Sequence, residues 1–257
     1  MTVKDKVVLV TGANRGIGQA LAAEALARGA KRVYACARQP LAHPDDRVTS
    51  LKLDVTSAAQ IQAAASQVES LDMLINNAGI MLRDDLTDPV VLERHLAVNL
   101  FGTYAVTQAF LPAVTRSRGA IVNILSANAL APLPFMIPAY SVSKAAAFSM
   151  TQSLRALVAG QGVRVHAVLP GPVDTDMTRG SDVPTASPES VALAIFDAVD
   201  NGEEEIFPDP ASAPMAAQWR EGPAKVLERQ LAQVVPVSSA RAAPAARGWR
   251  SAPHCQT

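Results

Sequence analysis

Residues 6–18 read KVVLVTGANRGIG, an apolar run followed by a turn with glycines at positions 12, 16 and 18. A helical pattern follows from Gln19 to Arg28 and ends at Gly29. Glycines let the backbone approach a pyrophosphate closely, and the first-turn amides of the next helix attract its negative charge. The stretch therefore predicts a strand, a turn and a helix that bind a dinucleotide, with a purely structural glycine turn as the alternative.

The rest of the chain repeats this alternation of apolar runs and alanine-rich helical stretches. Such alternation predicts an α/β fold: a Rossmann-type, doubly wound parallel sheet in a three-layer α/β/α arrangement, forming a single domain. Ligands of such sheets bind at the carboxyl ends of the strands. Residues 90–116 and 140–159 each read as one long helix. The strands are expected near Val7, Val33, Leu51, Met73, Ile121, Val163 and Ile206.

The pattern changes after Pro210. We predict a dinucleotide-binding catalytic domain over residues 1–210 and a C-terminal helical extension over residues 211–234. Residues 235–257 are rich in Ala, Pro, Ser and Arg, and their apolar residues are too sparse to offset the entropy lost on ordering. We therefore expect a disordered tail there.

The charge balance limits the classes of partner. The chain has 23 basic and 23 acidic residues, so no sequence-wide field attracts nucleic acid or an anionic membrane, and small molecules are the expected partners. The start MTVKDKVVLV carries charges where a signal peptide needs an apolar core, and the two cysteines form no disulfide framework. We expect a cytoplasmic protein. The four histidines lack metal-ligand spacing, so no metal is expected.

Tyr140 and Lys144 stand four residues apart in the sequence AYSVSK. On a helix this spacing places both side chains on one face. There the lysine ammonium would lower the pKa of the tyrosine phenol towards the working range of an acid–base catalyst. Taken alone, such a pair more often belongs to a solvated helix with the lysine in water.

Further segments follow in a fixed order: Asp54-Val55, Asn76-Asn-Ala-Gly79, Asn99, Ser126 and Pro170-Gly-Pro-Val-x-Thr175. Together with the TGANRGIG turn and the Tyr140/Lys144 pair, they resemble the short-chain dehydrogenase/reductase family, in the branch with a TGxxxGxG loop and a YxxxK pair. The resemblance covers roughly residues 4–208.

The resemblance implies an NADPH-dependent oxidoreductase that reduces a ketone or aldehyde to an alcohol, reversibly, by hydride transfer. Tyr140 would act as the acid and base, and Ser126 would orient the carbonyl. Lys144 would lower the Tyr140 pKa and bind the nicotinamide ribose, and Asn99 would hold a water that links Lys144 to solvent. The implied catalytic residues are Asn99, Ser126, Tyr140 and Lys144.

The expected preference for NADP(H) over NAD(H) rests on the end of the second strand. NAD-using relatives place a carboxylate there, which would repel a 2′-phosphate. Here Ala37 is followed by Arg38, and Arg15 approaches from the glycine turn; guanidinium groups suit a phosphate, and exposed surface charge is the alternative. Asp54 is expected at the adenine, with a helix cap as its alternative. The implied cofactor-binding residues are Gly12, Asn14, Arg15, Gly16, Ile17, Gly18, Arg38, Asp54, Val55, Asn77, Ala78, Gly79, Tyr140, Lys144, Pro170, Gly171, Val173 and Thr175.

Apolar residues around the implied site favour an apolar carbonyl or alcohol substrate, although the core or a subunit contact explains them equally well. They are Met81, Leu82, Leu130, Leu133, Phe135, Met136 and Ile137. The resemblance also implies a homodimer or homotetramer. Two other functions of this fold stay open: an NADP(H)-binding redox sensor or scaffold without turnover, and an isomerase or dehydratase.

Overall fold

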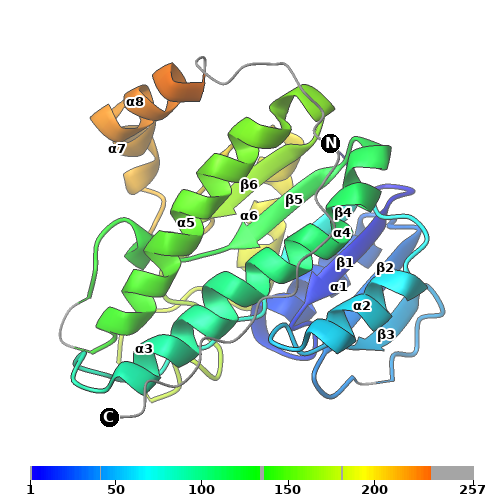
Figure 1. Ribbon diagram of the computed structural model, residues 1–257, viewed down its shortest axis with the longest axis horizontal. Coiled ribbons are helices and arrows are strands. Elements are labelled where there is room, and N and C mark those ends of the chain that lie inside the picture. Colours follow the sequence, from blue (N-terminus) through cyan, green and yellow to red (C-terminus); the bar gives the residue numbers. More distant parts are fainter. Residues whose placement is uncertain (1, 41, 134–135, 181, 233–257) are drawn as a thin grey trace, which may run out of the picture.

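A seven-stranded parallel sheet forms the centre of the computed structural model, which describes residues 2–40, 42–133, 136–180 and 182–232 (Figure 1). The strand order β3-β2-β1-β4-β5-β6-β7 reverses direction from β1 outwards, as a doubly wound sheet requires. This confirms the predicted fold class. The strands are β1 (Val7–Thr11), β2 (Arg32–Ala37), β3 (Val48–Lys52), β4 (Met73–Asn76), β5 (Ala120–Ile124), β6 (Arg164–Val168) and β7 (Glu205–Ile206).

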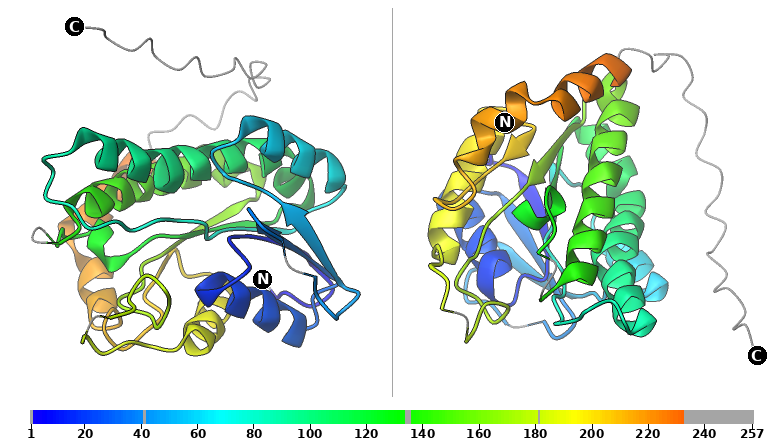
Figure 2. Two further views of the ribbon diagram at one scale, coloured as in Figure 1. Left: turned by 90° about the horizontal axis from the view of Figure 1, so that it is seen from below. Right: turned by 90° about the vertical axis from the view of Figure 1, so that its left-hand side faces the viewer.

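Helices cover both faces of the sheet (Figure 2, left). α1 and α6 lie on one face, and α2, α4 and α5 lie on the other. The helices are α1 (Gly16–Ala27), α2 (Ala58–Gln67), α3 (Pro89–His95), α4 (Thr103–Ser117), α5 (Pro138–Val158), α6 (Pro188–Asp200), α7 (Met215–Glu221) and α8 (Pro223–Ala232), with short 3-10 turns at Ala127–Ala129 and Ala159–Gln161.

The alternation of side chains along the strands produces a large apolar core on each face of the sheet, and a smaller core surrounds Phe148. In β1, Val8 and Val10 pack into the core that contains Leu21 of α1, whereas Leu9 packs into the core that contains Phe110 of α4. Every residue of β1, β4 and β5 is buried, which explains why these strands are mostly apolar in sequence, with Asn76 and Asn123 among the buried polar exceptions.

The stretch 90–116 differs from its prediction as one long helix. A π-helical segment, Leu96–Gly102, separates α3 from α4 and carries Asn99. A wider turn of this kind changes the direction of the side chains that it carries, and such turns are frequent at functional sites.

Residues beyond β7 form α7 and α8, drawn in orange beside α5 (Figure 1). The proposed division of the chain at residue 210 stays a prediction, and the tail predicted for 235–257 lies outside the described residues. Within the described residues, no helix is both long and apolar enough to cross a bilayer.

Candidate active site

The glycine turn lies at the carboxyl end of β1. Gly12 and Gly16 have φ values of +66° and +52°, in the left-handed region that favours glycine. A Cβ on Gly18 would lie 2.2 Å from the Gly12 carbonyl oxygen, so α1 starts directly against the turn. The backbone is thus exposed to a ligand with no side chain in between, as a dinucleotide turn requires.

The first turn of α1 offers its amides to such a ligand. Its N-cap residue, Arg15, has an extended backbone and makes no side-chain hydrogen bond to the amides of that turn. Free amides and the helix dipole together attract an anion, so the residues present fit a dinucleotide pyrophosphate.

The Asn76-Asn-Ala-Gly79 segment is fixed to the glycine turn. The Asn77 amide Nδ2 donates to the carbonyl oxygens of Thr11 (2.9 Å) and Gly12 (3.2 Å). In return, the Thr11 hydroxyl accepts the backbone N–H groups of Asn77 and Ala78, each at 3.0 Å. The predicted adenosine-side residues therefore lie beside the predicted pyrophosphate turn.

The two arginines predicted to read a 2′-phosphate are exposed. Arg38 follows β2, and Arg15 forms an ion pair of 2.7 Å with Asp176 from the loop after β6. The Asp54 carboxylate accepts from the Thr56 hydroxyl and N–H, which lowers the pKa of Asp54, and the positive charge of Arg38 lowers it further. Ser57, and not Asp54, caps α2.

Tyr140, Ser126 and Lys144 are buried together at the carboxyl end of β5, with 8%, 7% and 5% of their surfaces exposed. Burial raises the pKa of Tyr140 to about 12, and a hydrogen bond with the Ser126 side chain opposes that rise. The sequence predicted the opposite direction, a pKa lowered by Lys144. Desolvation of the phenol outweighs the opposing effect of the Ser126 side chain.

Lys144 points along the face of the Tyr140 ring. Its Nζ donates to the Ile124 carbonyl oxygen at 3.0 Å and lies 5.6 Å from the centroid of the ring. Burial lowers the pKa of Lys144 to about 8. A Cβ on Gly79 would lie 3.6 Å from Nζ, so this glycine keeps the space beside the ammonium open.

Asn99 and Lys144 border the same glycine, since a Cβ on Gly79 would lie 3.2 Å from Asn99 Oδ1 and 3.6 Å from Lys144 Nζ. The Asn99 side chain pairs with both backbone groups of Ile80: Oδ1 accepts the N–H at 2.9 Å, and Nδ2 donates to the carbonyl oxygen at 3.0 Å and to the Ser143 hydroxyl at 2.9 Å. The π-helical segment aims Asn99 at this neighbour. The water-holding role implied by the resemblance stays a prediction.

The predicted apolar pocket divides into two groups. Ile137 is buried and Leu130 packs against the core around Phe148, whereas Leu133 and Met136 are 44% and 39% exposed. Phe135 lies outside the described residues. The exposed pair is therefore the part of the loop that is free to meet a substrate.

Sequence reasoning missed three residues that shape this site. Asp84 accepts from the Ala139 N–H at the start of α5, one residue before Tyr140. His95 is fully buried, accepts from the Leu82 N–H at 3.0 Å and stacks edge-on against Tyr140. Asp209 accepts from the Gly171 N–H at 2.8 Å. No local pattern marks them, because their partners are distant in sequence.

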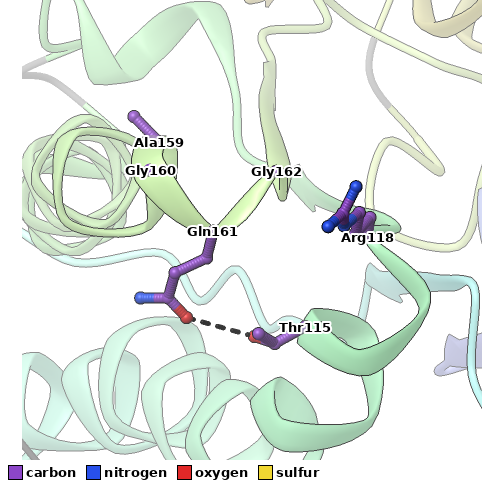
Figure 3. A pocket seen from close by; sticks show the side chains of 6 residues that line it. All are labelled: Thr115, Arg118, Ala159, Gly160, Gln161 and Gly162. Atoms are coloured by element: carbon purple, nitrogen blue, oxygen red, sulfur yellow. Dashed lines mark hydrogen bonds between the residues drawn. The ribbon is translucent and has the colours of Figure 1, made fainter. Parts of the chain in front are cut away.

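A surface hollow of about 560 Å³ lies elsewhere, at the amino ends of β5 and β6 (Figure 3). It is lined by Thr115, Arg118 and residues 159–162, and a weak hydrogen bond of 3.4 Å joins Thr115 to Gln161 across it. Its position at the opposite edge of the sheet separates it from the candidate active site.

The doubly wound sheet, with a glycine turn at its carboxyl edge, places the chain in the class of Rossmann-type dinucleotide-binding proteins. A family model described as short chain dehydrogenase matches residues 6–184. The chain therefore belongs to the short-chain dehydrogenase family.

Individual relatives agree with this assignment. The chain is 37% identical over 186 residues to 2-(S)-hydroxypropyl-CoM dehydrogenase 3 of Xanthobacter autotrophicus. This match covers 66% of this chain and 72% of that protein. The chain is also 34% identical over 200 residues to estradiol 17-beta-dehydrogenase 2 of Mus musculus, covering 71% of this chain and 52% of the mouse protein. The chain thus spans about half the length of the mouse relative.

Solved structures give the same result. A short chain dehydrogenase from Burkholderia cenocepacia, solved in complex with NADP, has a TM-score of 0.80 and 36% identity, covering 90% of this chain and 99% of that chain. The aldohexose dehydrogenase of Thermoplasma acidophilum, solved without ligand, has a TM-score of 0.70 and 28% identity, covering 80% of this chain and 92% of that chain.

Proposed function

We propose that this protein is an NADPH-dependent oxidoreductase that reduces a ketone or aldehyde to an alcohol, reversibly. The observation that carries the proposal is that Tyr140 and Ser126 are buried together at the sheet edge that also holds the glycine turn. Such an arrangement provides a proton donor beside a dinucleotide site.

A bound nicotinamide would supply the hydride to the carbonyl carbon, and the side chains of this chain act on the carbonyl oxygen. The Tyr140 phenol donates the proton to that oxygen, and the Ser126 hydroxyl fixes its orientation by a hydrogen bond. Because burial raises the pKa of Tyr140 to about 12, the phenol is protonated at neutral pH, which is the form that reduction needs. Lys144 and Asn99 complete the proposed catalytic set.

NADP(H) is the proposed cofactor because two exposed guanidinium groups, Arg15 and Arg38, border the adenosine side and no carboxylate follows Ala37 directly. The NADP complex of the Burkholderia relative supports this choice. The Asp176 carboxylate pairs with Arg15, so a 2′-phosphate must displace this carboxylate or share the guanidinium group with it.

The proposed substrate is an apolar carbonyl compound or alcohol, since Leu133 and Met136 expose apolar surface on the loop between Ser126 and Tyr140. We further propose a cytoplasmic homodimer or homotetramer that acts on small molecules and binds neither nucleic acid nor membrane. The balanced charge of 23 basic and 23 acidic residues supports the last point.

The experiment is an optical assay of NADPH and NADH oxidation with a panel of aromatic and aliphatic aldehydes and ketones. We expect turnover that prefers NADPH and that disappears in Tyr140→Phe, which should still bind the cofactor because only the proton donor is removed. Activity retained by Tyr140→Phe would refute the mechanism, and a preference for NADH would refute the cofactor assignment. Tight NADPH binding without turnover on any compound would favour the sensor or scaffold function.

A further inference from the structure

We propose that Asp209 is a positioning residue for the nicotinamide end of the cofactor, because it holds the Pro170-Gly171 turn in place. The inference rests on the proposed function and adds to it a residue outside the segments that resemble the family. It also gives the chain beyond β7 a part in the site.

Asp209 is 4% exposed, and both of its carboxylate oxygens are fully engaged. Oδ2 accepts from the Gly171 N–H and from the Ser212 hydroxyl, each at 2.8 Å. Oδ1 accepts from the N–H groups of Ala211 and Ser212, each at 3.0 Å. Hydrogen bonds to an ionised group are stronger than neutral ones, and a buried carboxylate needs them to offset its desolvation. Asp209 therefore joins two segments of backbone firmly.

Gly171 lies directly against this carboxylate. A Cβ on Gly171 would be 2.8 Å from Asp209 Oδ1 and 2.9 Å from Ala211 Cβ. The turn is thus seated on Asp209 with no room for a side chain, and its position depends on the carboxylate beneath it.

The same turn connects the two halves of the candidate site. On one side, the Pro170 carbonyl oxygen accepts the N–H of Ala127, the neighbour of Ser126, at 2.9 Å. On the other side, Thr175 borders the glycine turn, since a Cβ on Gly16 would be 3.0 Å from its methyl group. Residues 170–175 therefore run from the proposed proton-donating side chains to the pyrophosphate turn. The nicotinamide end of a dinucleotide must bind between these two places. The adenosine end, at Arg38 and Asp54, lies away from Asp209 on the other half of the sheet.

The Asp209→Asn variant isolates the bond to Gly171. Its amide oxygen can still accept from Ala211 and Ser212, but its NH2 group then faces the Gly171 N–H, so donor meets donor. Ser212→Ala is the matched control because it removes one hydroxyl partner of Asp209 and leaves the Gly171 bond intact. Gly171→Ala displaces the same turn because its Cβ would collide with Asp209 and Ala211, and it replaces Asp209→Asn as the test variant if that protein does not fold.

The measurement compares the dissociation constants of NADPH and of 2′,5′-ADP, which has the adenosine end alone. Losing a buried hydrogen bond to a charged group should raise the NADPH constant by about tenfold in Asp209→Asn and in Gly171→Ala. Binding of 2′,5′-ADP should stay within about twofold of the unmodified protein, and Ser212→Ala should bind both ligands normally. Unchanged NADPH binding, or an equal loss for both ligands, would overturn the positioning role. An unmodified protein that binds neither ligand would instead refute the proposed function, and the inference with it.

Discussion

At the scale of single residues, burial sets the protonation of the two titratable groups in the candidate site. It raises the pKa of Tyr140 to about 12 and lowers the pKa of Lys144 to about 8. In both cases the uncharged form gains, because the site is dry. Tyr140 therefore keeps its proton in the folded protein until the pH is well above neutral, while Lys144 is close to losing its own.

Lys144 gives a testable pH dependence of stability. Its pKa is about 8 in the folded protein and near 10.5 when exposed, so between these values the unfolded chain binds more protons and stability rises with pH. We expect the free energy of unfolding of the unmodified protein, measured relative to Lys144→Met, to increase by about 2 kcal/mol from pH 7 to pH 10. The difference between the two proteins removes the contributions of Tyr140 and of other common groups.

Urea unfolding of the cofactor-free proteins at several pH values measures this difference. A gap between the two proteins that does not change with pH would mean that Lys144 titrates in the folded state as it does in water. The sequence could not predict the direction in which the pKa of Tyr140 shifts. The Tyr140/Lys144 spacing is local, whereas burial depends on everything packed around it.

At the scale of elements, the helix that carries Tyr140 and Lys144 is capped from outside. α5 starts at Pro138, and its N-cap residue, Ile137, makes no side-chain hydrogen bond. The Asp84 carboxylate supplies the missing acceptor, at 3.1 Å and 3.3 Å from the Ala139 N–H. A carboxylate at this end also interacts favourably with the helix dipole. The start of α5 is therefore positioned by the segment that follows Gly79.

Removing this cap should affect both stability and catalysis. We expect Asp84→Ala to lower the free energy of unfolding by about 1 kcal/mol, the usual cost of a lost N-cap. We also expect kcat to fall by about tenfold, since Tyr140 directly follows Ala139 and proton transfer is sensitive to small displacements. Chemical unfolding and steady-state kinetics measure the two effects.

Two variants serve as controls for Asp84→Ala. Asp84→Asn keeps an amide oxygen that can accept from Ala139, so most of the activity should return. Asp85→Ala removes a carboxylate whose hydrogen bonds, within the part of the chain that the structure describes, stay inside its own turn, so kcat should not change. Equal losses of kcat in Asp84→Ala and Asp85→Ala would show that the loop as a whole, and not the cap, matters.

Features that depend on local sequence patterns could be predicted, whereas features that depend on contacts between distant residues could not. The glycine turn, the seven strands and the Tyr140 helix were predictable because periodicity and spacing are local. The roles of Asp84 and Asp209 were not predictable, because their carboxylates accept from backbone N–H groups that are 55 and 38 residues away in the sequence. The π-helical segment was also missed, since the contact that it serves, between Asn99 and Ile80, joins two different elements.

At the scale of the whole molecule, the chain after β7 is anchored through charge. Lys225 of α8 is 2% exposed, and its Nζ donates to Glu204 (2.7 Å), Glu205 (3.0 Å) and Glu228 (3.1 Å). Arg155 of α5 contacts Glu205 at 2.8 Å and Glu228 at 2.6 Å. These five side chains connect α8 to the end of the sheet and to the helix that carries Tyr140.

The structural importance of this cluster can be tested at Lys225. Lys225→Met leaves Glu205, which is 5% exposed, with Arg155 alone, and breaking a buried ion pair on one side is costly. We expect the free energy of unfolding to fall by about 3 kcal/mol. Arg220→Met is the matched control, because it breaks an exposed pair with Glu203, at 2.7 Å, that should contribute at most about 1 kcal/mol. Urea unfolding at neutral pH measures both variants. Equal, small losses would mean that α8 is held no more firmly than by a surface contact, whereas the expected difference makes the region after β7 an integral part of the folded domain.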